Sequence, residues 1–189
     1  HILITLEDNK MKIKLLSYIM AGMVLLMASS CNLPDKNLDP ARQTDVALNL
    51  IMPSKLSQSA LNQSANPARN SGIIMQQFEG FDAQQVAYTT YSIPDNTFNN
   101  YWRTGLYAAV LKDAQDIIDR ADVAGQPYYA GIAKIIMAHE YAMAASMFGD
   151  IPFTEALQGN DNLKPGYDTQ EAVYNSVQTM LDDAISDLS

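Results

Sequence analysis

The stretch YYAGIAKIIMAHEYAMAASMF, residues 128–148, is apolar on almost every side when it is wound into a helix. A helix at a protein surface keeps one polar face, whereas a helix that is hydrophobic all round is covered by neighbouring elements. Gly and Pro lie on both sides of the stretch, in GQP at 125–127 and GDIP at 149–152, and such residues end helices. We therefore predict a central helix over 128–148, around which the other helices pack.

Two amphipathic segments flank this central helix. Before it, residues 101–121 carry an apolar stripe at helical spacing and a polar opposite face. The stripe consists of Trp102, Leu106, Ala109, Val110, Ile117, Ile118 and Ala121, and the polar face of Lys112, Asp113, Asp116, Asp119 and Arg120. After it, a third helix opens at Asp168 or Thr169, where Glu171 completes a pattern like a capping box. The apolar face of this third helix consists of Val173, Val177, Met180, Leu181, Ala184, Ile185 and Leu188.

Three such helices in antiparallel order form an array of helical hairpins. The tetratricopeptide pattern places a large aromatic, Leu, Gly and Tyr on one helix, then small residues and a Pro on and after the next. The chain follows this pattern loosely, at a longer spacing, with Trp102, Gly105, Leu106, Tyr107, Ala142, Ala144, Ala145, Phe148 and Pro152. We predict an all-α fold of tetratricopeptide-like stacked hairpins. The sequence stops at Ser189 within the third helical pattern, so we expect a truncated N-terminal part of a larger α-rich protein.

The residues before this array contain weaker helical signals. A helical pattern begins at Thr44 and is interrupted at Pro53, after which Leu56, Ala60 and Leu61 recur at helical spacing. A second short helix starts at Asn66-Pro67 and runs toward Phe78. Residues 79–100 are rich in Gln, Thr, Tyr and Asn, with a turn at Pro94-Asp95-Asn96, and we predict an extended loop that packs aromatic residues over the helices.

The lone cysteine, Cys31, follows a leader-like segment. Lys12 and Lys14 precede the apolar run 15–27, and Ala28-Ser29-Ser30 lies directly before the cysteine. This order of basic, apolar and small residues is typical of a secretory signal, and a cysteine at the cleavage point indicates lipidation of Cys31 and anchoring to a membrane. We therefore divide the chain into an upstream extension and lipoprotein signal peptide (1–30), a flexible tether (31–43) and a helical domain (44–189).

Charge and composition exclude several functions. Hydrophobic residues make up 48% of the chain, enough for a folded core, and 21 acidic residues outnumber 12 basic ones, so the surface repels nucleic acid. His139-Glu140 lacks the second histidine of a zinc protease motif, because Met143 occupies that position. The carboxylates Asp113, Asp116, Asp119, Asp182 and Asp183 have the pattern of solvated faces, and Asn160-Asp161-Asn162 lacks the last glutamate of a calcium loop. We expect no catalytic residue, metal site or cofactor.

One cluster has the composition of a sugar-binding surface, because sugars stack on aromatic rings and hydrogen-bond to amides. It consists of Tyr88, Tyr91, Asn96, Asn99, Asn100, Tyr101 and Trp102. The position of Trp102 on the apolar stripe favours core packing, whereas Tyr88 and Tyr91 are freer to contact a ligand. The sequence alone assigns no ligand-binding residue.

Two linked motifs resemble the SusD/RagB family of Bacteroidetes lipoproteins: FGDIPFTEAL at 148–157 and KPGYDTQEAVY at 164–174. One departure is His139-Glu140, where many relatives carry Arg-Ala or Lys-Ala. The resemblance implies a lipid-anchored, surface-exposed outer-membrane protein that binds oligosaccharides or other nutrients without altering them, and that partners a SusC-like TonB-dependent transporter. Two alternatives stay open: a tetratricopeptide-like scaffold lipoprotein that mediates protein contacts without sugar binding, and an enzyme whose catalytic residues lie beyond Ser189.

Overall fold

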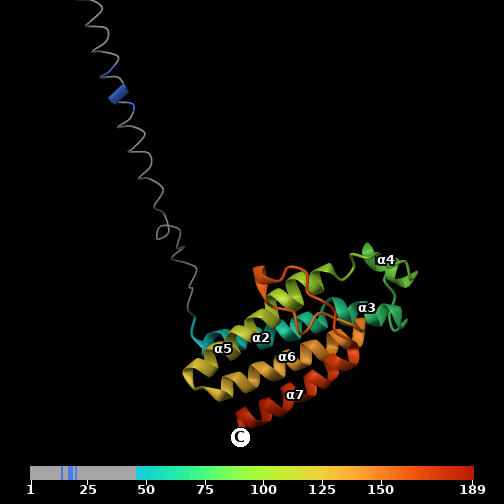
Figure 1. Cartoon of the computed structure of the whole chain (residues 1–189). Coiled ribbons are helices and arrows are strands. Elements are labelled where there is room, and N and C mark those ends of the chain that lie inside the picture. Colours follow the sequence, from blue (N-terminus) through green and yellow to red (C-terminus); the bar gives the residue numbers. More distant parts are fainter. Residues whose placement is uncertain (1–13, 15–16, 19, 21–45) are drawn as a thin grey trace, which may run out of the picture. The chain divides into compact units, whose positions relative to one another are not determined.

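The computed structural model describes residues 14, 17, 18, 20 and 46–189, and residues 46–189 form one compact unit (Figure 1). The predicted signal peptide, the predicted tether and Cys31 lie outside the described residues, apart from the isolated positions 14, 17, 18 and 20. Within residues 46–189 the regular structure is helical, and the only strand-like pairing there is an isolated antiparallel bridge between Ile151 and Asp168. The predicted all-α class is confirmed.

The central helix is α6, Pro127–Phe148, which packs against α5 (Lys112–Ala124) and α7 (Gln170–Leu188). Figure 1 shows α5, α6 and α7 side by side as consecutive antiparallel helices. Small side chains allow this close packing, and the buried positions of α6 include Ala130, Gly131, Ala133, Ala138, Ala144 and Ala145. Gly125 ends α5 in a left-handed conformation (φ 64°), which costs a glycine little. Pro127 then starts α6 one residue before the predicted position, because proline suits the first turn of a helix.

The helix before α6 changes its pitch along its length. Residues Tyr101–Leu111 form the π-helix η2, which continues directly into α5. A π-helix has i to i+5 hydrogen bonds and a wider turn than an α-helix, and its buried positions here are Tyr101, Gly105, Leu106, Val110 and Leu111. The apolar stripe therefore starts at Tyr101 and not at Trp102, which is a correction to the regular helical spacing we predicted. Trp102 is partly buried and packs at the edge of the core.

Helix α2, Leu48–Ser64, runs through Pro53 without a break, so the predicted interruption is wrong. Proline removes one backbone hydrogen bond, but both Pro53 and the residue four positions earlier, Asn49, are exposed, and water can satisfy the freed carbonyl. The predicted apolar side of this helix is also wrong, because Leu56 and Leu61 are exposed. The buried side consists of Leu48, Met52, Ser59 and Asn62.

Two short helices follow: α3, Asn66–Ile74, and α4, Gln84–Thr89. The first was predicted, but α4 replaces the middle of the predicted extended loop. Gly80 is fixed against this helix, since its N–H donates to Thr89 Oγ1 (2.9 Å) and a Cβ on Gly80 would lie 2.4 Å from the Gln85 carbonyl oxygen. Tyr88 is buried, with 3% of its surface exposed, because it lies on the inner side of α4.

Helix α7 begins as the sequence predicts, at the Asp168–Thr169 boundary. Thr169 caps the helix by accepting a hydrogen bond from Ala172 N, so the capping box from Asp168 to Glu171 is wrong in detail. Val173, Val177 and Ala184 are buried along α7, whereas Ile185 from the predicted apolar face is 64% exposed.

Candidate functional site

The segment between α6 and α7 contains most of the two motifs at 148–157 and 164–174, and carboxylates hold it in place. Asp168 Oδ2 accepts hydrogen bonds from the backbone N–H groups of Phe153 (3.0 Å) and Thr154 (2.9 Å), and the Thr154 hydroxyl also donates to this carboxylate. The pKa of Asp168 is lowered, first by the Thr154 backbone hydrogen bond and against a smaller effect of burial. Asp150 accepts from Gln170 N, and Glu155 accepts from Gly166 N. The acidic residues of the motifs thus fix the loop shape.

A pocket of about 380 Å³ lies between α4, the loop 94–100 and the first turn of η2. We call it the amide pocket, and its lining residues are Gln84, Ala87, Tyr88, Pro94, Asn96, Thr97, Asn99, Asn100 and Arg103. Its volume lies at the small end of the ~300–1,000 Å³ range of ligand pockets. The four amide side chains are exposed, so their donors and acceptors can reach a ligand.

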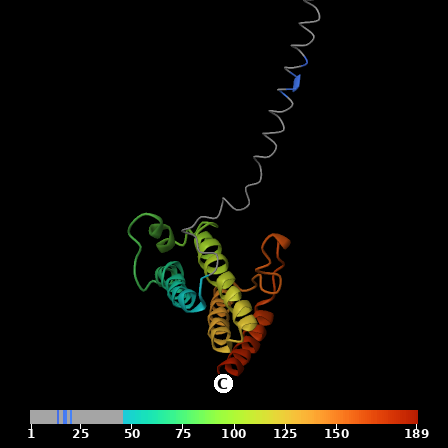
Figure 2. The same ribbon diagram turned by 90° about the vertical axis from the view of Figure 1, so that its left-hand side faces the viewer.

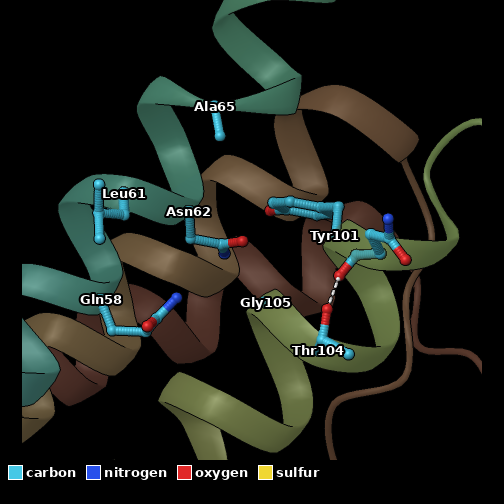
Figure 3. A pocket seen from close by; sticks show the side chains of 8 residues that line it. Gln58, Leu61, Asn62, Ala65, Tyr101, Thr104 and Gly105 are labelled. Atoms are coloured by element: carbon cyan, nitrogen blue, oxygen red, sulfur yellow. Dashed lines mark hydrogen bonds between the residues drawn. The ribbon is translucent and has the colours of Figure 1, made fainter.

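A second depression, of about 210 Å³, lies between α2 and η2 (Figure 3). We call it the interhelical pocket, and it is lined by Gln58, Leu61, Asn62, Ala65, Asn100, Tyr101, Thr104 and Gly105. Asn100 lines both pockets, so they are adjacent on the surface. The Thr104 hydroxyl donates to the Asn100 carbonyl oxygen at 2.8 Å, which fixes the backbone at this shared position (Figure 3).

Tyr101 forms the wall of the interhelical pocket, with its ring directed from η2 toward α2 (Figure 3). Its side chain is 2% exposed, and its hydroxyl has no hydrogen-bond partner of standard geometry among the described residues. Burial raises the pKa of Tyr101, the carboxylate of Glu140 raises it further, and the Gln63 side chain acts in the opposite direction. Tyr101 therefore stays neutral at physiological pH.

A buried carboxylate lies beneath this region and joins α2 to α6. Glu140 is 0% exposed and accepts hydrogen bonds from three side chains of α2: Ser59 Oγ (2.6 Å), Asn62 Nδ2 (3.1 Å) and Gln63 Nε2 (2.8 Å). A buried charge is tolerated when donors surround it. Sequence reasoning missed this role, because Glu140 was considered only with His139 as half of a metal motif. His139 itself is exposed.

The structure brings together part of the predicted aromatic and amide cluster. Tyr88, Asn96, Asn99 and Asn100 line the amide pocket, although Tyr88 is buried in its wall and is not free as we expected. Tyr91 is 56% exposed, does not line either pocket and donates its hydroxyl hydrogen to the Ile74 carbonyl.

Trp102 lines neither pocket and packs against the core. Its ring stacks on Tyr107 at 5.9 Å and lies 4.6 Å from Phe148, so its packing against the core is confirmed. Five lining residues of the amide pocket lie outside the predicted cluster: Gln84, Ala87, Pro94, Thr97 and Arg103. Arg103 could have been found from its helical spacing to Asn99 and Asn100, which places the three on one side of the chain.

Two of the five carboxylates interpreted as solvated faces form ion pairs. Asp113 pairs with Lys55, and Asp116 pairs with Arg120 at 3.4 Å. Among the residues that the structure describes, no group of three or more His, Cys, Asp or Glu side chains is arranged to hold a metal ion. Within the same residues, no helix combines the length and the apolar character needed to cross a membrane.

The fold and the pocket together define a class: an all-α, tetratricopeptide-like protein with an amide-lined surface depression. A family model described as SusD-like, starch-binding and associating with the outer membrane matches residues 39–189. The chain therefore belongs to the SusD-like family, and the resemblance seen in the two motifs is confirmed.

A solved structure with a similar fold is the crystal structure of a SusD/RagB family protein from Bacteroides thetaiotaomicron. The two chains share 27% sequence identity with a TM-score of 0.68, over 77% of this chain and 31% of the other. The chain thus spans less than a third of the length of this relative. No curated protein sequence matches it.

Proposed function

We propose that the protein binds oligosaccharides across the amide pocket and the interhelical pocket, without altering them. The observation that carries this proposal is the position of Asn100, which lines both depressions and so places them next to each other. A site of two adjacent depressions suits a ligand built of repeated units. The family description as starch-binding supports a saccharide as that ligand.

The chemistry of the lining supports the same ligand class. Asn96, Asn99 and Asn100 each offer a carbonyl acceptor and an NH₂ donor, and a sugar hydroxyl can pair with both. The site is shallow and exposed, so water-mediated contacts contribute and affinity is modest. No assembled acid–base pair lies among the described lining residues of either pocket, which supports binding without turnover.

Replacing Asn100 with alanine is expected to weaken oligosaccharide binding by about five- to thirtyfold, since one or two hydrogen bonds of about 1 kcal/mol each are lost. The measurement is calorimetry of the purified protein against a glycan panel, with analysis of the glycans afterwards for cleavage products. Asn175→Ala is the matched control, because Asn175 is an exposed asparagine of α7 that lines neither pocket.

Three outcomes would contradict this proposal. Equal weakening in the Asn175 variant would mean that the site lies elsewhere. Cleavage of any glycan by the pure protein would contradict the part of the proposal that says the ligand is bound without being altered. If no glycan binds while a membrane partner is recovered, the scaffold alternative takes its place.

We further propose that the protein is held at the cell surface by a lipid on Cys31 and delivers its ligand to a SusC-like TonB-dependent transporter. The order of residues before Cys31 and the family's association with the outer membrane support this proposal. The expected result is that the wild type co-purifies with a TonB-dependent barrel from solubilised outer membranes and carries a labelled acyl chain. Cys31→Ala should lose the label and leave the membrane fraction.

The lipid anchor and the transporter partner can be contradicted separately. Unchanged membrane attachment of Cys31→Ala would contradict the lipid anchor. A labelled wild-type protein recovered without a barrel would contradict the transporter partner.

A further inference from the structure

The amide pocket contains one charged side chain among its lining residues, the guanidinium of Arg103. No aspartate or glutamate lines the pocket, although acidic residues outnumber basic ones 21 to 12 in the chain. In an otherwise acidic protein, the positive Arg103 attracts an anionic group of a ligand to the amide pocket and not to the surrounding surface. The charged side chain that lines the amide pocket is therefore positive, whereas the net charge of the chain is negative.

Arg103 is exposed and makes no hydrogen bond or ion pair with any described residue. The other two arginines of residues 46–189 do have partners: Arg120 donates to the Val46 carbonyl at 2.6 Å, and Arg69 is also engaged. The five N–H donors of Arg103 are thus available to a bound molecule. The fold therefore does not use the Arg103 guanidinium in an interaction within the described residues.

From these observations we infer that the ligand is an acidic oligosaccharide whose isolated carboxylate, as in a uronic acid, binds Arg103. This inference rests on the proposed saccharide-binding function and names the substrate class of the same site. A guanidinium presents a planar fork that matches a carboxylate with two parallel hydrogen bonds. A neutral sugar over Arg103 removes water from the guanidinium without compensating its charge, whereas a carboxylate compensates it.

The neighbouring residues define the rest of the ligand. Asn99 and Asn100 lie one helical turn before Arg103, so amide groups flank the place where the carboxylate binds. These amides match the hydroxyl groups of the same sugar ring. The exposed Asp95 adjoins the lining residues in sequence, and the net charge of the chain is −9, so a densely charged polymer is repelled. The ligand therefore carries acidic units spaced among neutral ones.

The test uses calorimetry with pairs of oligosaccharides from several backbones, in which each uronic-acid member is matched with its carboxyl-reduced neutral counterpart. We expect the wild type to bind the acidic member about tenfold or more tightly, because a hydrogen bond to a charged group is stronger than one to a neutral group. High salt should reduce this preference. Arg103→Gln should lose the preference, because its affinity for the acidic member should fall toward its affinity for the neutral one.

Lys164→Gln is the matched control, since it removes one exposed positive charge outside both pockets and should keep the full preference. Thermal melting of both variants should match the wild type, because Arg103 has no partner to lose. Equal or tighter binding of the neutral members by the wild type would overturn this inference and leave the saccharide function standing. If neither member of any pair binds, the saccharide function itself fails.

Discussion

Replacing Glu140 with alanine is expected to lower the free energy of unfolding by about 3–5 kcal/mol, because three donors, two of them buried, lose their acceptor together. Ser59, Asn62 and Gln63 all donate to this carboxylate, and Ser59 and Asn62 are themselves buried. The truncation also leaves a cavity between α2 and α6. Chemical denaturation of the purified protein, followed by circular dichroism, measures the loss.

Glu140→Gln separates the hydrogen bonds from the charge. Glutamine keeps the shape, its carbonyl can accept from the two amides, and its NH₂ can donate to the Ser59 hydroxyl oxygen, so we expect a loss of only about 1 kcal/mol. His139→Ala is the neighbouring control, and its exposed side chain should matter by less than about 0.5 kcal/mol. Equal losses for the alanine and glutamine variants, or a loss near zero for alanine, would contradict the role of the carboxylate as the common acceptor.

Replacing Gly105 with alanine is expected to destabilise the protein by about 2 kcal/mol, although alanine is the better helix former. A Cβ at this position would lie 1.9 Å from Asn62 Oδ1 and 2.9 Å from Asn62 Cγ. The Asn62 side chain cannot move aside freely, because its Nδ2 donates to Glu140. The methyl group must therefore push α2 and η2 apart, and denaturant unfolding measures the cost.

The double variant Gly105→Ala with Asn62→Ala tests the cause of this loss. Asn62→Ala removes the atoms that the new methyl group meets, so the double variant should be more stable than the sum of the two single losses predicts, by about 1 kcal/mol. Additive losses would show that the helix packing, and not the contact with Asn62, explains the glycine.

Local signals predicted the elements of the fold well. The apolar character of α6, the glycine after α5 and the proline at the start of α6 depend on residues that are neighbours in sequence. The start of α7 was also located from sequence, although the cap is Thr169, which accepts from Ala172 N, and not the predicted Asp168. Such interactions form in the same way whatever the rest of the chain does, so a pattern of a few residues is enough to predict them.

The buried side of α2 could not be predicted in this way. Its exposed leucines and buried Ser59 and Asn62 reverse the usual pattern, because the partner that makes burial of these polar groups favourable is Glu140, which is 78 residues from Asn62 in sequence. A buried polar group is stable only with its partner in place, and a sequence window that contains one of the two cannot show the pair.

The sequence by itself determined the helical class, the order of the hairpins and the family, because periodicity and two short motifs carry that information. Tertiary structure decided the site. Gln84 and Arg103 come from different elements, and only the tertiary arrangement of α4, the loop 94–100 and the start of η2 places them around one pocket. Their side chains form a binding surface only because the fold creates the amide pocket between these elements. The shape of that pocket depends on contacts between residues far apart in the chain.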